Sequence, residues 1–191
     1  MAYSSWEPGL SLASPVYFDA NVLVGAVVTK HRLYASSVQL IGDLLASQGS
    51  ILISLLAFQE SLWALARISY CDLFNQPSNA HFSLKIYEKR CKEIFAAYGE
   101  RMGAVGSMIN AWSQAGVSVE VVPKTESSFA SVSSLTPRYM SEFSLAPGDA
   151  VHLALAGLHA KTFITADADF EEAAASPSFT NLAVLHLAAK G

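Results

Sequence analysis

The sequence predicts an α/β domain built around a mainly parallel sheet. Short apolar runs alternate with stretches of helical periodicity along the 191 residues. The runs are continuously apolar and rich in branched residues, as in strands that are buried on both faces of a sheet. Hydrophobic residues make up 52% of the chain and charged residues 15%, which excludes a disordered chain. The strands are expected at 16–18, 51–54, 117–122, 162–165 and 182–187.

Helical patterns fill the intervals between these strands, as crossover connections in a parallel sheet require. Segment 71–115 is longer than one crossover helix needs, so we expect an inserted helical arm there within a single domain over 1–191. The segment 75–79 and the serine-rich segment 127–137 are expected to be linkers. The helices are expected at about 20–28, 34–48, 55–70, 80–98, 102–115, 126–134, 148–160 and 168–175.

Charge and composition narrow the class of protein. The net charge is −4, so a nucleic-acid partner would need a local basic patch, or a metal ion that offsets repulsion between acids and phosphates. Cys71 and Cys91 are too few for a disulfide framework. The N-terminal segment has no basic residue, and no stretch reaches the ~20 apolar residues of a membrane helix. We therefore expect a cytoplasmic protein without a membrane contact.

Carboxylates follow or interrupt the apolar segments at four places. Asp19 follows the first expected strand, where open α/β sheets bind ligands, although Asp is also a favoured helix cap. Glu60 lies on the apolar stripe of the helix that Ser54 begins, where burial of an unpaired charge is costly. An ion pair with Arg67 would also explain Glu60.

The other two places repeat this pattern. Asp149 suits the positive end of a helix that begins near Pro147, and it also lies on the core face of that helix. Asp167 and Asp169 follow the apolar run that ends at Thr165. We expect Asp167 to face a metal ion and Asp169 to support it through a hydrogen bond or a water molecule, although the two roles could be reversed.

Acids crowded at one end of a sheet repel each other unless protons or a cation neutralise them. Oxygen ligands favour Mg²⁺ or Mn²⁺ over zinc. Such an ion can activate water and stabilise charge on a phosphoryl group. A phosphatase with an aspartate nucleophile usually has a second acid two residues later, but Asn21 occupies that position here. His152 and His159 are interpreted as core or surface histidines, because no third histidine completes a zinc site.

Taken together, the four segments resemble the PIN-domain nuclease family. The matching motifs are DAN from Asp19, the S-x5-E segment from Ser54 to Glu60, DAVHLALA from Asp149 and TADADF from Thr165. They occur in the order and at the intervals of the family, and the resemblance spans about 16–187. It implies a PIN-like three-layer α/β/α fold with a five-stranded, mainly parallel sheet.

The resemblance also implies a function. Asp19, Glu60, Asp149 and Asp167 would be the catalytic acids and would bind Mg²⁺ or Mn²⁺, with Asp169 as a further ligand. The side chains of Asn21, Ser54 and Thr165 would orient this set through hydrogen bonds. The expected activity is endoribonuclease cleavage of RNA phosphodiester bonds, without a covalent nucleophile.

Many small prokaryotic members of this family are VapC-like toxins of toxin–antitoxin pairs, and these are often dimeric. An antitoxin-like protein partner and a homodimer are therefore expected. The chain departs from that pattern in length, at 71–115 and at 123–146. The alternative is a PIN-like module with a weak or idle pocket that acts through protein or RNA binding, because a high apolar fraction can mark a partner site.

Overall fold

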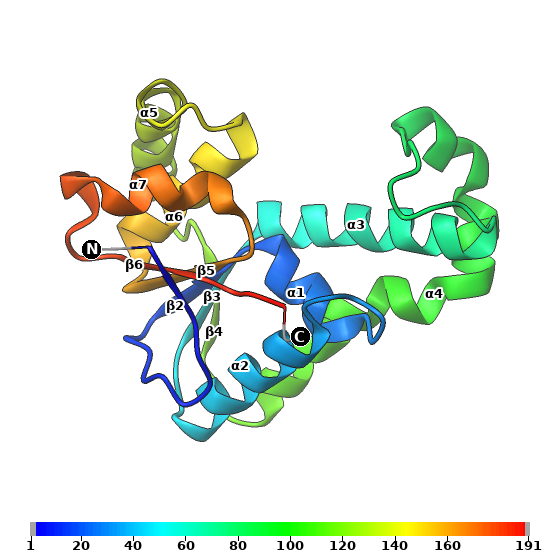
Figure 1. Cartoon of the computed structure of the whole chain (residues 1–191), viewed down its shortest axis with the longest axis horizontal. Helices are drawn as coiled ribbons and strands as arrows, with labels where there is room; N and C mark the ends of the chain where they lie inside the picture. The colour runs from blue at the N-terminus through cyan, green and yellow to red at the C-terminus, as the bar shows by residue number, and fades with distance from the viewer. Residues whose placement is uncertain (1–2, 190–191) are drawn as a thin grey trace.

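A six-stranded sheet forms the centre of the fold, and every pair of neighbouring strands in it is parallel. The computed structural model describes residues 3–189 and places helices on both faces of the sheet (Figure 1). The strand order is β1-β6-β5-β2-β3-β4. The strands are β1 (Ser4–Ser5), β2 (Val16–Phe18), β3 (Ile51–Ser54), β4 (Val119–Val122), β5 (Thr162–Thr165) and β6 (Ala183–His186).

The three-layer α/β/α fold is as expected, but the sheet has six strands and the expected number of five is wrong. The additional strand is β1, in which Ser4 pairs with Leu185 and Ser5 with His186. The amide of Trp6 extends this pairing by donating to the His186 carbonyl at 2.8 Å. Two exposed serines carry no apolar pattern, so only the backbone pairing at the sheet edge reveals this strand.

The hydrophobic core has two parts, one on each face of the sheet, and different helices cover them. Val16 and Phe18 of β2 pack with α1–α4, whereas Tyr17 packs with α5–α7. All three side chains are fully buried, which explains why this strand is continuously apolar. The helices are α1 (Ala20–Val27), α2 (Tyr34–Ala46), α3 (Leu55–Leu73), α4 (Leu84–Gln114), α5 (Glu126–Glu142), α6 (Pro147–His159) and α7 (Glu171–Ala175).

The expected break between helices 80–98 and 102–115 appears as a kink, and one other expectation for the helices is wrong. Two helical stretches meet in α4 where the backbone of Tyr98 leaves the helical region. The linker expected at 127–137 lies inside α5, whose first turn is capped by the side chain of Thr125. Serine favours turns only weakly, and here burial of the apolar face of α5 against α6 outweighs that preference.

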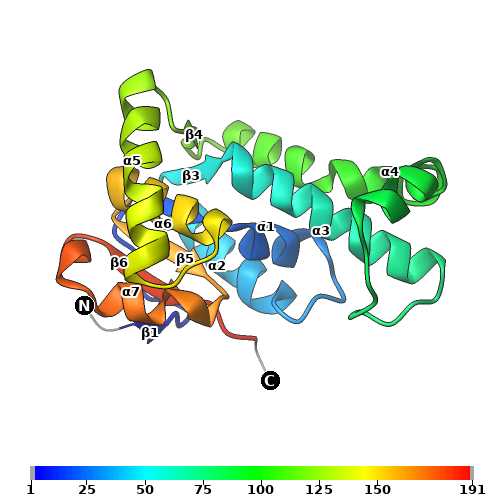
Figure 2. The ribbon, with the colours of Figure 1, turned by 90° about the horizontal axis from the view of Figure 1, so that it is seen from above.

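The far end of α3 and the first part of α4 extend together beyond the sheet (Figures 1 and 2). Aromatic side chains hold the two helices together there: the ring of Tyr87 on α4 lies 5.7 Å from that of Trp63 on α3, and Phe82 of the connecting segment lies 5.0 Å from Trp63 and 5.3 Å from Tyr70. Arg101 also donates to Asp72 at 2.7 Å. Across residues 3–189, no helix combines the length and the apolar character that a membrane crossing requires.

Phe163 tests the packing of the core on the α6 side of the sheet. Its side chain is fully buried, and its ring lies 4.9 Å from that of Phe170 and 5.5 Å from that of Tyr17. We expect Phe163→Ala to lower the free energy of unfolding by about 3–5 kcal/mol, because it leaves a cavity. Denaturant titration measures this loss. Phe129→Ala, on the exposed side of α5, is the control and should change stability by less than about 0.5 kcal/mol.

Candidate functional site

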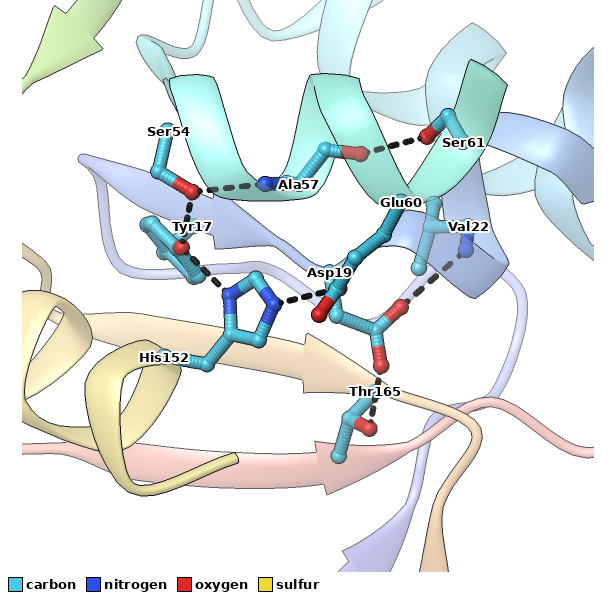
Figure 3. Close-up of polar contacts among 9 residues, drawn as sticks. All are labelled: Tyr17, Asp19, Val22, Ser54, Ala57, Glu60, Ser61, His152 and Thr165. Atoms are coloured by element: carbon cyan, nitrogen blue, oxygen red, sulfur yellow. Dashed lines mark hydrogen bonds and ion pairs between the residues drawn. The ribbon is translucent and has the colours of Figure 1, made fainter. Parts of the chain in front are cut away.

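The residues that follow β2 and β5 meet the first turns of α3 and α6 at one end of the sheet (Figure 3). Since β2 lies between β5 and β3 and all three are parallel, their carboxyl ends share one edge. This edge brings together side chains that are far apart in the sequence. We call Asp19, Glu60, Asp149 and Asp167 the acidic site.

Asp19 is the most buried member of the acidic site, with 4% of its surface exposed. Its Oδ1 accepts a hydrogen bond from the Val22 amide at 3.2 Å, so Asp19 does cap α1. Its Oδ2 accepts a short hydrogen bond from the Thr165 hydroxyl. Burial raises the pKa of Asp19, and these hydrogen bonds oppose that rise. The capping interpretation of Asp19 is therefore confirmed.

Thr165 links two acids, as the sequence predicts for a residue that orients them. Its hydroxyl donates to Asp19 and accepts from the Asp167 amide at 3.0 Å. Asp167 Oδ1 in turn accepts from the Asp169 amide at 3.0 Å and begins the short turn η1 (Ala168–Phe170). Asp169 itself is exposed and lines a separate hollow beside Ser144. Asp167 therefore caps the turn η1.

Asp149 lies in the first turn of α6, half-buried beside the other acids. Burial is the largest cause of the rise in its pKa, and the negative charge of Asp167 is the next. Glu60 and Asp169 raise the pKa further, while His152 lowers it. Asp149 thus responds to burial and to the charges of three carboxylates, one on α3 and two after β5.

Glu60 makes a contact that the sequence interpretation did not include. Its Oε2 lies 2.8 Å from Nε2 of His152, a side chain of α6 that is 2% exposed. The other ring nitrogen, Nδ1, lies 2.7 Å from the hydroxyl of Tyr17. The partner considered from the sequence, Arg67, donates instead to the carbonyl of Ser78 at 2.7 Å.

Ser54 and Asn21 occupy positions that differ from those expected for residues orienting the acids. The Ser54 hydroxyl caps α3 by accepting from the Ala57 amide at 2.9 Å, and it also accepts from the Tyr17 hydroxyl at 2.8 Å. It therefore reaches Glu60 only through Tyr17 and the ring of His152. Asn21 is exposed on α1, where it lines a groove.

Sequence reasoning missed His152 and Tyr17, although both left a signal. His152 follows Asp149 by three residues, which places the two on the same face of a helix. Tyr17 is the middle residue of a strand, so it points to the opposite face from its neighbours, toward α6. A phenol in a fully buried strand needs a hydrogen-bond partner, and His152 supplies one.

A groove of about 1610 Å³ follows α3 from Glu60, the member of the acidic site that lines it, toward the projecting ends of α3 and α4. Asn21 and Glu60 line one end of the groove, and Trp63, Phe82 and Tyr87 line the other. Because α3 carries both Glu60 and Trp63, one helix connects the acids to the aromatic end.

The acidic site suits a hard divalent cation in the chemistry of its donors, which are all carboxylate oxygens. The repulsion that contributes to the raised pKa of Asp149 is a cost that a cation would remove. Within residues 3–189, however, no three Asp, Glu, His or Cys side chains are close enough to hold one ion together. The donors are of the kind that binds such an ion, and they lie at one end of the sheet. Their side-chain positions do not form a closed ligand group.

The raised pKa of Asp149 predicts a change of stability with pH. A carboxyl whose pKa is higher in the folded chain than in the unfolded chain lowers stability above the folded pKa, and this cost disappears as the pH falls below both values. Asp149→Asn should therefore increase the free energy of unfolding at pH 7 in chelator-treated buffer, by up to about 1 kcal/mol. Thermal unfolding should show this gain shrinking toward pH 4. If Asp149→Asn is less stable than the wild type at pH 7, the prediction that the charge of Asp149 lowers stability is wrong.

Comparisons with known proteins extend to the fold. No protein-family model matches the sequence, and no curated protein matches it. The structure is similar to a chain in the crystal structure of VapBC2 from Rickettsia felis bound to a DNA fragment from their promoter. The TM-score is 0.51 and the sequence identity 12%, over 90% of this chain and 97% of that chain. At this identity the similarity shows a shared three-layer fold, and the function has to be argued from the acidic site.

Proposed function

We propose that the protein is a divalent-metal-dependent endoribonuclease that hydrolyses RNA phosphodiester bonds with Mg²⁺ or Mn²⁺. The observation that carries this proposal is the placement of acids after β2 and β5 and on α3 and α6 at one edge of the sheet, where burial and neighbouring carboxylates raise the pKa of Asp149. The order of the four motifs along the chain supports the same activity, and so does the fold shared with a chain of VapBC2.

In this proposal Asp19, Glu60, Asp149 and Asp167 hold the metal ion, and Asp169 supports them through water. The ion supplies an activated water molecule and offsets the charge of the phosphate. Asp19 is held by Thr165 and by the first turn of α1, which leaves its carboxylate in a fixed position.

The groove along α3 is the proposed path of the RNA. It opens at Glu60 and continues past Trp63 toward the aromatic side chains between α3 and α4. A single strand can lie in such a groove with its bases against aromatic rings, which offer a surface for stacking. The phosphate to be cleaved would then lie over the acidic site.

We also propose a protein partner. The resemblance to VapC-like toxins and the fold shared with a chain of the VapBC2 structure support an antitoxin-like partner, a homodimer and a cytoplasmic location. The exposed apolar side chains Leu84 and Phe95, which line the groove near the start of α4, are suitable for a protein contact.

A second candidate function is a PIN-like module that binds protein or RNA without cleaving it. Two observations favour it: the acids do not form a closed ligand group within residues 3–189, and Glu60 already has a partner in His152. Titration calorimetry with Mn²⁺ separates the two candidates. The nuclease should give a heat of binding that Asp149→Asn reduces, whereas an idle module should give none.

The test of the nuclease is cleavage of a mixed RNA substrate in Mn²⁺, with and without EDTA. We expect the chelator to abolish cleavage and Asp19→Asn to reduce it by more than about 100-fold, which exceeds the usual effect of a residue behind the ligands. Glu100→Gln, an exposed acid on α4, is the matched control and should cleave at the wild-type rate. Cleavage that survives both EDTA and Asp19→Asn would exclude the metal mechanism.

A further inference from the structure

We propose that α6 sets the position of Glu60 through two residues, His152 and Gly148, which act as positioning residues for this acid. The inference builds on the proposed metal-dependent nuclease, because it concerns how one of its acids is held. His152 provides a hydrogen bond to one carboxylate oxygen, and Gly148 provides the space for the other.

His152 is held rigidly enough to serve this purpose. Its ring is 2% exposed, and both ring nitrogens have a partner: Nε2 lies 2.8 Å from Glu60 and Nδ1 lies 2.7 Å from Tyr17. Tyr17 is fully buried in β2, at the centre of the sheet. A buried ring with both nitrogens engaged cannot rotate without losing a hydrogen bond, which is costly. His152 therefore offers Nε2 at a fixed point.

The hydrogen bonds form a closed circuit that begins and ends on α3 (Figure 3). The Ser54 hydroxyl caps α3, accepts from Tyr17 and so connects the beginning of that helix to the sheet. Tyr17 contacts His152 on α6, and His152 returns to Glu60 in the second turn of α3. The side chain of Glu60 is 40% exposed, so without this circuit it could turn into solvent.

Gly148 makes the complementary contribution. A Cβ atom at this position would lie 3.1 Å from Oε1 of Glu60 and would meet no other atom within 4 Å. Gly148 belongs to the first turn of α6, where the helix dipole favours a carboxylate. Glu60 is thus held against the beginning of α6, beside Asp149, with one oxygen on His152 and the other over Gly148. The contribution of Glu60 to the raised pKa of Asp149 agrees with this placement.

Two substitutions of His152 separate positioning from simple stabilisation. His152→Gln can place an amide near the position of Nε2 and keep the contact with Glu60, while it loses Tyr17. His152→Asn can place an amide near Nδ1 and keep Tyr17, while it loses Glu60. His152→Gln loses a buried hydrogen bond and His152→Asn a half-buried one, so His152→Gln should lower the melting temperature at least as much as His152→Asn.

The affinity for Mn²⁺, measured by titration calorimetry without RNA, should distinguish these variants. We expect His152→Asn to weaken it by about 10-fold or more and His152→Gln to stay within about 3-fold of the wild type. Gly148→Ala should also weaken it, without a loss of thermal stability, because alanine is the better helix former. Equal affinities of the two His152 variants, or a wild-type affinity in Gly148→Ala, would overturn the inference.

A metal-free measurement keeps this inference separate from the proposed function. In protein labelled with ¹⁵N-histidine, Glu60→Ala should shift the Nε2 resonance of His152, whereas Asp167→Asn should leave it in place. If the wild type binds no Mn²⁺, the nuclease proposal fails, and the resonance still decides whether His152 holds Glu60. If Glu60→Ala leaves the Nε2 resonance of His152 unchanged, the inference is overturned, whether or not the wild type binds Mn²⁺.

Discussion

The position of β2 at the centre of the sheet is the constraint on which the site depends. Because β5 flanks it on one side and β3 on the other, its residues are completely buried and its polar groups must find partners inside the protein. Asp19, just beyond its end, is bonded to Thr165 at the end of β5. Tyr17, in its middle, is bonded to Ser54 at the end of β3 and to His152 on α6. The partners of these two buried polar groups thus tie three strands and a helix together.

Outside the site, acidic and basic side chains form ion pairs with each other, whereas the site itself remains acidic. Several basic side chains are already paired with acids elsewhere on the surface, and the carboxylates around Asp149 are left to repel each other. Exposed pairs of this kind add little stability. The pairs are Arg90–Glu93, Arg101–Asp72, Lys124–Glu120 and Arg138–Glu142. The acidic site therefore carries an electrostatic repulsion that lowers the stability of the fold. Sites with perturbed pKa values commonly bind a ligand.

Local patterns predicted much of the fold, and long-range contacts account for what they missed. The bounds of β2, β3 and β5 were predicted correctly because continuous burial leaves an apolar run, whereas β1 consists of two serines and left no such trace. Asp19 and Asp167 were singled out because strand ends are visible in a sequence, and Glu60 and Asp149 because they lie on apolar helix faces. His152 was set aside, since its contacts join residues 92 and 135 positions apart, and no spacing rule reaches so far. Whether the acids form a closed ligand group also could not be predicted, because it depends on side-chain positions that a sequence pattern does not give.

The length of α3 has a mechanical consequence. This single helix of 19 residues carries Glu60 near its beginning and Tyr70 among the aromatic side chains near its end. A continuous helix behaves as a stiff rod, roughly 28 Å long at about 1.5 Å per residue. A molecule that separates α3 from α4 near Tyr70 would tilt the whole of α3. This tilt would move the carboxylate of Glu60. Tyr70 and Glu60 lie ten residues apart on this helix, about 15 Å, so a displacement of the tip is transmitted to an acid of the site.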